Sequence, residues 1–190
     1  MLVYARSEVS GCDGGEMKEL VLGGVRSGKS RYAEQQARAS ALRVVYIATA
    51  IPTDDAELEE RIRRHRSHRP AEWITVEEPV ALGAALRTHA GAECCLLVEC
   101  LTLWLAHLLT SGSADRLERE RASLLLAVQE IPGQVILVGN ETGLGIMPPG
   151  ALSRRFLDAS GELHQSLAAS CDRVTLVVAG LPQRLKEVLP

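Results

Sequence analysis

The sequence lacks a long apolar run and a surplus of charge of either sign. Its apolar runs are far shorter than the roughly 20 residues that a membrane-spanning helix needs, so no membrane span is expected. The 21 Lys and Arg residues nearly balance the 24 Asp and Glu residues, so no broad basic surface is predicted and nucleic acid is not an expected partner.

A cysteine framework and an export signal are missing as well. The five cysteines are an odd number without C-x-x-C spacing, which predicts thiols and argues against a disulfide scaffold or a zinc site. Cys94 and Cys95 begin an apolar run, so at least one of them is expected to be buried. Arg6, Glu8 and Asp13 interrupt any apolar segment at the N-terminus, so no signal peptide is predicted and a cytoplasmic location is expected.

No internal repeat or low-complexity linker divides the chain. Residues 1–16 have no periodicity and end in a glycine-rich stretch, which predicts a flexible extension. Met17 directly precedes the first expected strand and is an alternative start of the chain. Residues 17–190 are expected to form a single domain.

Apolar segments typical of buried strands alternate with helix-forming segments. Strands are expected at residues 20–22, 43–48, 73–76, 94–98, 135–138 and 174–178, and helices at residues 31–39, 55–66, 79–88, 101–109, 114–130 and 151–170. This alternation predicts an α/β fold whose mostly parallel central sheet carries helices on both faces, followed by a short C-terminal tail. The site is expected at the carboxyl ends of the strands, where Thr49, Glu99, Asn140 and Glu141 fall.

A glycine-rich segment between the first strand and the first helix fits the P-loop pattern G-x-x-x-x-G-K-[ST]. Its residues are Gly23, Gly24, Val25, Arg26, Ser27, Gly28, Lys29 and Ser30. The backbone N–H groups of such a turn and the start of the helix suit a polyphosphate. Lys29 is expected to reach the β- and γ-phosphates, and the Ser30 hydroxyl to bind Mg²⁺.

Glu99 follows the fourth strand as an acidic residue follows a Walker-B strand. A carboxylate at this position can hold Mg²⁺ or accept the proton of an attacking hydroxyl. Because Asp is more usual there, a simple cap of the next helix is the alternative interpretation.

Residues 61–69 contain five arginines and two histidines. A solvated helix face is the ordinary interpretation of such a charge run. However, His65 shares a helical face with Leu58 and Ile62, and the flanking guanidinium groups disfavour an imidazolium, which keeps His65 uncharged and nucleophilic. This pattern suits attack on an α-phosphate, with His68 as the weaker candidate.

Together, five segments of the chain resemble the bifunctional adenosylcobinamide kinase/adenosylcobinamide-phosphate guanylyltransferase family of cobalamin biosynthesis. The resemblance runs from Met17 to about Lys186, and its most specific blocks are residues 22–31, 46–50, 61–70, 99–105 and 140–148. The resemblance implies a RecA-like P-loop NTPase fold with three layers and a homotrimer.

The resemblance also implies two reactions. Adenosylcobinamide would be phosphorylated with ATP or GTP, and GMP from GTP would then pass to adenosylcobinamide phosphate through a guanylyl-histidine at His65. Lys29 and Glu99 are the other expected catalytic residues, and Ser30 and Glu99 the expected Mg²⁺ ligands. Besides the P-loop, the expected nucleotide contacts are Ile47, Ala48, Thr49, Arg66, Ser67, His68, Arg69, Glu77 and Glu99.

Two positions depart from the family pattern. His107 and His164 stand where the family usually has Asn, and both retain a hydrogen-bonding side chain, so tuning of activity is expected at these positions. Two other functions stay open at this point: a P-loop ATPase or switch module without nucleotidyl transfer, and a small-molecule kinase of unrelated substrate. Neither alternative has a catalytic use for His65.

Overall fold

The structure is a computed structural model that describes residues 16–51, 56–67, 69–111 and 113–188. Within residues 56–67 the backbone is described, whereas six side chains are not: those of Glu57, Leu58, Arg61, Arg64, His65 and Ser67. The flexible extension predicted for residues 1–16 therefore lies outside the described residues, except for Glu16.

A seven-stranded sheet forms the centre of the described chain. Its strands are β1 (Met17–Gly23), β2 (Arg43–Ala48), β3 (Ile74–Glu77), β4 (Cys94–Glu99), β5 (Gln134–Asn140), β6 (Arg173–Val178) and β7 (Leu181–Glu187). They lie in the order β3-β2-β4-β5-β1-β6-β7. The first six strands run parallel, and β7 pairs antiparallel with β6 at one edge.

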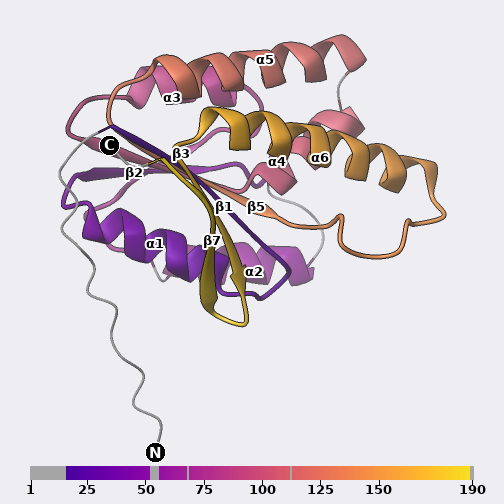
Figure 1. The fold of residues 1–190 in the computed structure, drawn as a ribbon, viewed down its shortest axis with the longest axis horizontal. Coiled ribbons are helices and arrows are strands. Elements are labelled where there is room, and N and C mark those ends of the chain that lie inside the picture. The colour runs from indigo at the N-terminus through magenta and orange to yellow at the C-terminus, as the bar shows by residue number, and fades with distance from the viewer. Residues whose placement is uncertain (1–15, 52–55, 68, 112, 189–190) are drawn as a thin grey trace, which may run out of the picture.

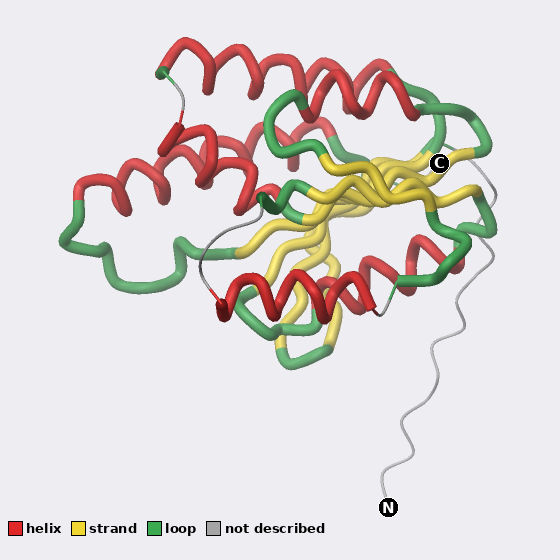
Figure 2. The backbone as a smooth tube through the Cα atoms, turned by 180° about the vertical axis from the view of Figure 1, so that it is seen from behind, coloured by secondary structure: helices red, strands yellow, loops and turns green. Residues whose placement is uncertain are grey.

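Helices cover both faces of this sheet. They are α1 (Lys29–Ala39), α2 (Ala56–Ser67), α3 (Leu82–His89), α4 (Leu101–Ser111), α5 (Ala114–Glu130) and α6 (Ala151–Ser170). Figure 1 shows α1 and α2 on one face and the other four helices on the opposite face. Figure 2 shows the same three layers from behind. The predicted α/β architecture is confirmed.

Each face of the sheet has its own apolar core because strand side chains alternate between the two faces. The larger core lies beneath α3–α6 and surrounds the fully buried Trp104, whose indole Nε1 donates to the Val80 carbonyl at 2.8 Å. The smaller core lies beneath α1 and contains Tyr46 and Leu97. Helix α1 is therefore held directly against the strands that frame its N-terminus.

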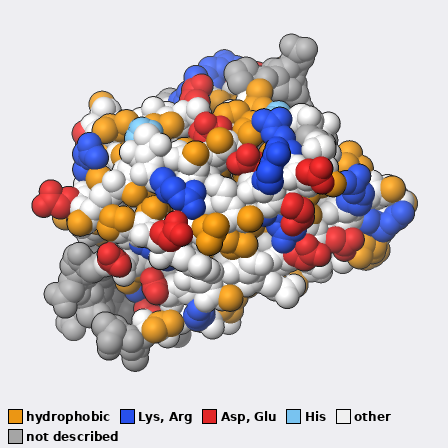
Figure 3. All heavy atoms as spheres, turned by 90° about the horizontal axis from the view of Figure 1, so that it is seen from above, with side chains coloured by type: hydrophobic (Ala, Val, Ile, Leu, Met, Phe, Trp, Pro, Cys, Tyr) orange, Lys and Arg blue, Asp and Glu red, His pale blue; other side chains and the backbone are white. Residues whose placement is uncertain are grey.

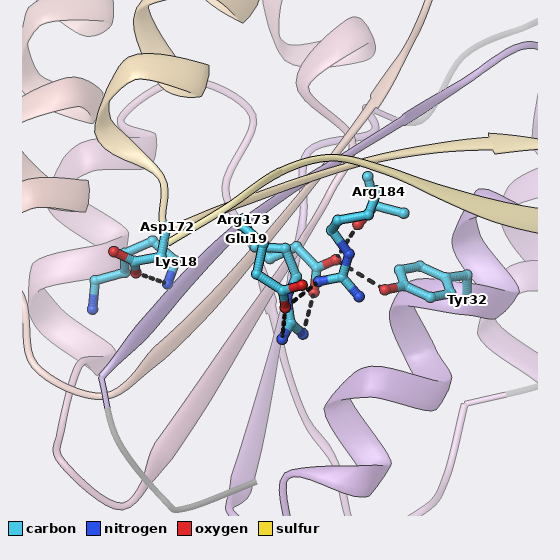
Figure 4. Close-up of polar contacts among 8 residues, drawn as sticks. Lys18, Glu19, Tyr32, Asp172, Arg173 and Arg184 are labelled. Carbon is cyan, nitrogen blue, oxygen red and sulfur yellow. Dashed lines mark hydrogen bonds and ion pairs between the residues drawn. The ribbon is translucent and has the colours of Figure 1, made fainter. Parts of the chain in front are cut away.

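β1 begins three residues before its predicted start because its two charged residues are buried with partners. The Lys18 ammonium donates to the carbonyls of Ile131 and Gly133 at 2.8 and 2.7 Å. Glu19 lies on the other face and accepts from Tyr32, as the close-up in Figure 4 shows. An apolar pattern detects neither residue.

Two further boundaries differ from the prediction. β7 occupies the expected tail. None of its residues is buried, so no apolar periodicity marks this segment as a strand. Helix α3 begins at Leu82, later than the predicted residue 79, because the Glu78 carboxylate accepts from the backbone N–H groups of Val80 and Ala81 and holds a turn there.

Four cysteines lie in the described part of the chain, and all four are thiols: Cys94, Cys95, Cys100 and Cys171. Burial was expected for at least one of Cys94 and Cys95, and both are buried. No helix among the described residues is long and apolar enough to cross a bilayer. Figure 3 looks onto the α3–α6 layer, where positive and negative side chains are interspersed without a continuous patch of one sign.

Candidate functional site

The carboxyl ends of four neighbouring strands meet at one edge of the sheet. Gly23 at the end of β1 pairs with Asn140 at the end of β5, and Ala48 at the end of β2 pairs with Glu99 at the end of β4. The residues that follow these strands therefore share one rim. The prediction that Thr49, Glu99, Asn140 and Glu141 fall there is confirmed.

The P-loop joins β1 to α1 on this rim, and two glycines give it its shape. Gly28 precedes α1 with φ of 94°, a left-handed conformation that side chains with a Cβ disfavour. A Cβ on Gly23 would lie 2.5 Å from Ser27 Oγ and 2.6 Å from the Val177 carbonyl oxygen. Arg26 also has positive φ, at 56°, and the Ser27 N–H donates to the Gly24 carbonyl at 3.2 Å, which closes a turn within the loop.

The turn between β6 and β7 braces the P-loop from one side. The Gly180 backbone N–H donates to the Ser27 carbonyl at 2.7 Å. A Cβ on Gly28 would lie 3.1 Å from Gly180 Cα, so only a glycine allows this approach without displacing the turn. The hairpin that the sequence did not predict is thus part of the site's framework.

Lys29, Ser30 and Glu99 come together between the P-loop and β4. The Lys29 ammonium donates to the Gly24 carbonyl at 3.2 Å, and the Ser30 hydroxyl donates to Glu99 Oε1. Tyr46 donates its hydroxyl to Glu99 Oε2 at 3.0 Å. Burial, and secondarily the charge of Glu99, raises the pKa of Tyr46 well above its ordinary value, so this phenol is a neutral donor.

This oxygen pair fits a magnesium ion. A serine hydroxyl and a carboxylate are the hard oxygen ligands that Mg²⁺ takes in nucleotide sites, where phosphate and water complete the octahedron. Within the described residues, no three His, Cys, Asp or Glu side chains gather closely enough to hold a metal by themselves. Ser30 and Glu99 would therefore supply the protein's share of the ligands.

Tyr46 also links this centre to the segment that follows α2. The Arg69 guanidinium lies 3.7 Å from the centroid of the Tyr46 ring, and Trp73 stacks on the same tyrosine with 6.4 Å between ring centroids. Arg66 pairs with Glu77 at the end of β3, and both side chains are half exposed. Sequence reasoning placed Arg66, Arg69 and Glu77 on the nucleotide individually and missed the contacts that Tyr46 makes.

The three predicted contacts at the end of β2 differ in orientation. The Ile47 side chain is fully buried in the larger core, on the face away from α1. Ala48 lies on the α1 face. Thr49 is nearly inaccessible, and its hydroxyl both donates to the Cys100 carbonyl and accepts from the Cys100 N–H at 2.7 Å. Thr49 therefore fixes the backbone directly after Glu99.

Besides Arg66 and Arg69, three further predicted site residues lie in or next to α2. The backbone of His65 and Ser67 belongs to α2, which follows β2 on the α1 face of the sheet, but their side chains are not among those described. His68 lies outside the described residues. The orientation and charge state predicted for His65 thus stay predictions.

The loop after β5 closes the other side of the rim. The Glu141 N–H donates to the Gly23 carbonyl at 3.0 Å, and its carboxylate accepts from the Gly143 N–H at 2.6 Å. Burial lowers the pKa of His164, while the charge of Glu141 opposes this shift. His107 lies on α4, where its ring contacts the Ser111 hydroxyl one helical turn later.

Beside this loop, an apolar cavity of about 300 Å³ lies between α4 and α6. Leu109, Pro148 and Phe156 are among its lining residues. Leu144 and Ile146 in the same loop are 85% and 98% exposed, so this part of the rim presents apolar side chains to solvent.

Some known proteins resemble this chain in sequence, and others resemble it in fold alone. The bifunctional adenosylcobalamin biosynthesis protein CobP of Pseudomonas aeruginosa is 56% identical over 170 residues, which cover 90% of this chain and 98% of that protein. CobU of Escherichia coli, also a bifunctional adenosylcobalamin biosynthesis protein, is 38% identical over 183 residues, covering 90% of this chain and all of that protein.

Among solved structures, an ATPase from the type III secretion system of pathogenic bacteria superposes with a TM-score of 0.54 and 9% identity, over 88% of this chain and 56% of that one. This likeness concerns the fold alone. Helices on both faces of one mostly parallel sheet make three layers. This is the RecA-like α/β fold of P-loop NTPases, as the resemblance implied. A family model described as cobinamide kinase / cobinamide phosphate guanyltransferase matches residues 19–185, and to this family the chain belongs.

Proposed function

We propose that this protein phosphorylates adenosylcobinamide with ATP or GTP and then transfers GMP from GTP to the adenosylcobinamide phosphate. The product of the second step is adenosylcobinamide-GDP, and pyrophosphate is released. Family membership supports both activities, and the relatives' printed names support a place in adenosylcobalamin biosynthesis.

In the first step, the P-loop N–H groups and Lys29 hold the triphosphate on the rim. Bound Mg²⁺, held by Ser30 and Glu99, would neutralise charge on the β- and γ-phosphates. The substrate hydroxyl attacks the γ-phosphorus, and the bond from that phosphorus to the β–γ bridging oxygen breaks. Glu99, the acidic residue at the end of β4, is the proposed acceptor of the hydroxyl proton.

In the second step, His65 is the nucleophile. An imidazole nitrogen attacks the α-phosphorus of GTP, the bond to the α–β bridging oxygen breaks, and pyrophosphate leaves. A phosphate oxygen of adenosylcobinamide phosphate then attacks the same phosphorus and frees His65. For this chemistry the imidazole must come within about 3.5 Å of the α-phosphorus. Arg66 and Arg69 would neutralise the charge that develops on the phosphate oxygens.

One observation carries the proposal most directly. A continuous chain of contacts runs from Ser30 through Glu99 and Tyr46 to Arg69, and so joins the P-loop to the segment that bears His65. A generic P-loop ATPase needs the first two residues but has no need of an arginine stacked beside them. The contacts therefore favour chemistry shared between the P-loop and the arginine-rich segment.

The acceptor is large and partly apolar, so we place it against the rim between Asn140 and Pro148. Glu141 and the exposed Leu144 and Ile146 are candidates for its contacts. A homotrimer and a cytoplasmic location, both expected from the sequence, are part of the same proposal.

The test supplies the full-length protein with adenosylcobinamide, ATP, GTP and Mg²⁺ and separates the products by chromatography. The unmodified protein should form the phosphate first and the GDP derivative second. His65→Ala should accumulate the phosphate without the GDP derivative, and Lys29→Ala should form neither. His89→Ala, which changes the histidine at the last position of α3, is the matched control and should form both products.

Other outcomes separate the alternatives. ATP hydrolysis without any phosphorylated corrinoid would support the ATPase or switch module. Phosphate formation with no GDP derivative in the unmodified protein would support a simple kinase. Full activity of His65→Ala would transfer the nucleophile's role to His68.

A further inference from the structure

A large polar hollow lies beside the P-loop, on the side away from Glu99. Its volume is about 670 Å³, which is well within the range of about 300–1,000 Å³ typical of ligand pockets. One wall is a single face of α1, since Gly28, Arg31, Tyr32, Gln35 and Gln36 recur at the spacing of helical turns. The opposite wall is the turn between β6 and β7 with the start of β7, where Ala179, Gly180 and Pro182 line the hollow.

The lining chemistry suits a nucleoside. Arg26 and Arg31 are exposed guanidinium groups that can stack on a base or pair with a phosphate. Gln35 and Gln36 offer amide donors and acceptors for a base or a ribose. Tyr32 contributes its ring, because its hydroxyl is already donated to Glu19 at 3.0 Å.

The order of the strands separates this hollow from the arginine-rich segment. From β1, the direction through β5 and β4 leads to β2 and β3, where α2 and Glu77 lie. The opposite direction leads to β6 and β7, which wall the hollow. The P-loop therefore lies between the β4 side of the sheet, where Ser30 contacts Glu99, and the β6–β7 side, where Arg26 lines the hollow.

The two reactions require a triphosphate bound to the P-loop to lie in opposite directions. Transfer of the γ-phosphate needs the end remote from the nucleoside near Ser30 and Glu99, which sends the nucleoside toward the hollow. Attack by His65 needs the α-phosphate near α2, so the nucleoside must lie on that other side. One orientation cannot satisfy both demands.

We propose that the hollow lined by Arg31, Gln35 and Pro182 binds the base and ribose of the nucleoside triphosphate that phosphorylates adenosylcobinamide. The GTP that donates GMP lies on the same P-loop in the reverse direction. This inference rests on the proposed function for the two reactions, whereas the binding site itself is a property of the hollow.

The first test compares the affinities of ATP and inorganic tripolyphosphate by calorimetry on the full-length protein. Gln35→Trp fills the hollow from an exposed position of α1, and Arg31→Ala removes a stacking group without adding bulk. Each variant should weaken ATP binding about tenfold, while Gln35→Trp leaves the affinity for tripolyphosphate unchanged. Gln129→Trp, on the exposed end of α5 at the amino edge of the sheet, is the matched control and should bind both as the unmodified protein does.

The second test compares the two reactions in Gln35→Trp. The KM for ATP in phosphorylation should rise about tenfold, whereas protein labelling by α-labelled GTP should keep its rate. Equal loss of phosphorylation and labelling would overturn the reversed orientation. Equal weakening of ATP and tripolyphosphate, or unchanged affinity for both, would overturn the nucleoside site.

These results remain distinguishable from a failure of the proposed function. The calorimetric comparison requires no turnover, so it tests the hollow even in a protein that neither phosphorylates a corrinoid nor labels itself. Conversely, loss of activity in His65→Ala leaves the ATP and tripolyphosphate comparison unaffected.

Discussion

At the scale of single residues, Glu99 connects the parts of the site through its two carboxylate oxygens. It accepts from Ser30 through one carboxylate oxygen and from Tyr46 through the other. The sequence indicated Ser30 and Glu99 because a P-loop and an acidic residue after a strand are local patterns. Tyr46 was not predicted because its contact with Glu99 depends on the pairing between β2 and β4. Once that pairing is known, strand alternation places Tyr46 and Glu99 on the same face of the sheet.

Tyr46→Phe tests this positioning role. The substitution removes the hydroxyl that donates to Glu99 and keeps the ring beneath Arg69. A hydrogen bond to a charged group contributes about 1.5 kcal/mol, so kcat/KM for phosphorylation should fall about tenfold. The concentration of Mg²⁺ that gives half-maximal rate should rise as well.

Tyr46→Leu provides the comparison, because it removes the ring as well as the hydroxyl. It should also slow labelling of the protein by α-labelled GTP, since Arg69 loses the aromatic ring on which its guanidinium stacks. Equal Mg²⁺ dependence in Tyr46→Phe and the unmodified protein would contradict a positioning role for the hydroxyl.

Glu19 gives a prediction about pH. Burial raises its pKa, although hydrogen bonds from Thr175 and Tyr32 and the charge of Arg173 oppose the shift. The folded state therefore binds a proton more tightly than the unfolded state, whose glutamate pKa is about 4.3. The stability that this proton provides is complete below that value and is lost as the pH rises through the raised, folded-state value.

Glu19→Gln removes this titration and keeps an oxygen that can accept from Thr175 and Tyr32. Urea unfolding between pH 4 and 7 should show the unmodified protein losing stability relative to the variant as the pH rises. A difference in unfolding free energy that is constant over this range would contradict the prediction.

At the scale of elements, sequence patterns located strands and helices wherever one face or both are apolar. The limits of α5 and α6 were predicted correctly, and β2 was too. β7 was missed because an exposed edge strand has no apolar face, and Pro182 near its start suggested a tail. The length of β1 was underestimated because Lys18 and Glu19 are buried with partners from distant segments.

Gly→Ala substitutions at two glycines with positive φ distinguish the free-energy cost of backbone strain alone from the cost of strain with a steric clash. Gly180 in the β6–β7 turn has φ of 80°, and a Cβ added there would meet no atom within 4 Å. A Cβ on Gly133, with φ of 82°, would instead lie 2.2 Å from the Gly91 carbonyl oxygen. Gly180→Ala should therefore cost about 1 kcal/mol of unfolding free energy. Gly133→Ala should cost about 3 kcal/mol or more, because the backbone itself must move.

Urea denaturation of the two variants, monitored by circular dichroism, measures both costs. The slope of unfolding free energy against urea should stay the same, so the difference appears in the midpoint. Similar midpoints for Gly133→Ala and Gly180→Ala would show that the α5–β5 turn is less tightly packed than the structure indicates.

At the scale of the whole molecule, the order of strands decides what the site can do. β1 lies inside the sheet, so the P-loop has neighbours on both sides: the rim of β5, β4 and β2 on one, and the β6–β7 turn on the other. Local sequence patterns predicted a parallel sheet but not this order, because the order is set by packing between distant segments. The hollow beside α1 was beyond sequence reasoning for the same reason.

The central claim is that His65 accepts GMP from a triphosphate seated on the P-loop. Its most direct test is to incubate the full-length protein with α-labelled GTP and Mg²⁺, isolate the labelled protein and map the label by peptide sequencing. We predict an acid-labile, alkali-stable adduct on His65 that passes to adenosylcobinamide phosphate when this acceptor is added. A labelled protein whose GMP stays in place on addition of the acceptor, or GDP-derivative synthesis with no adduct on His65, would contradict the account.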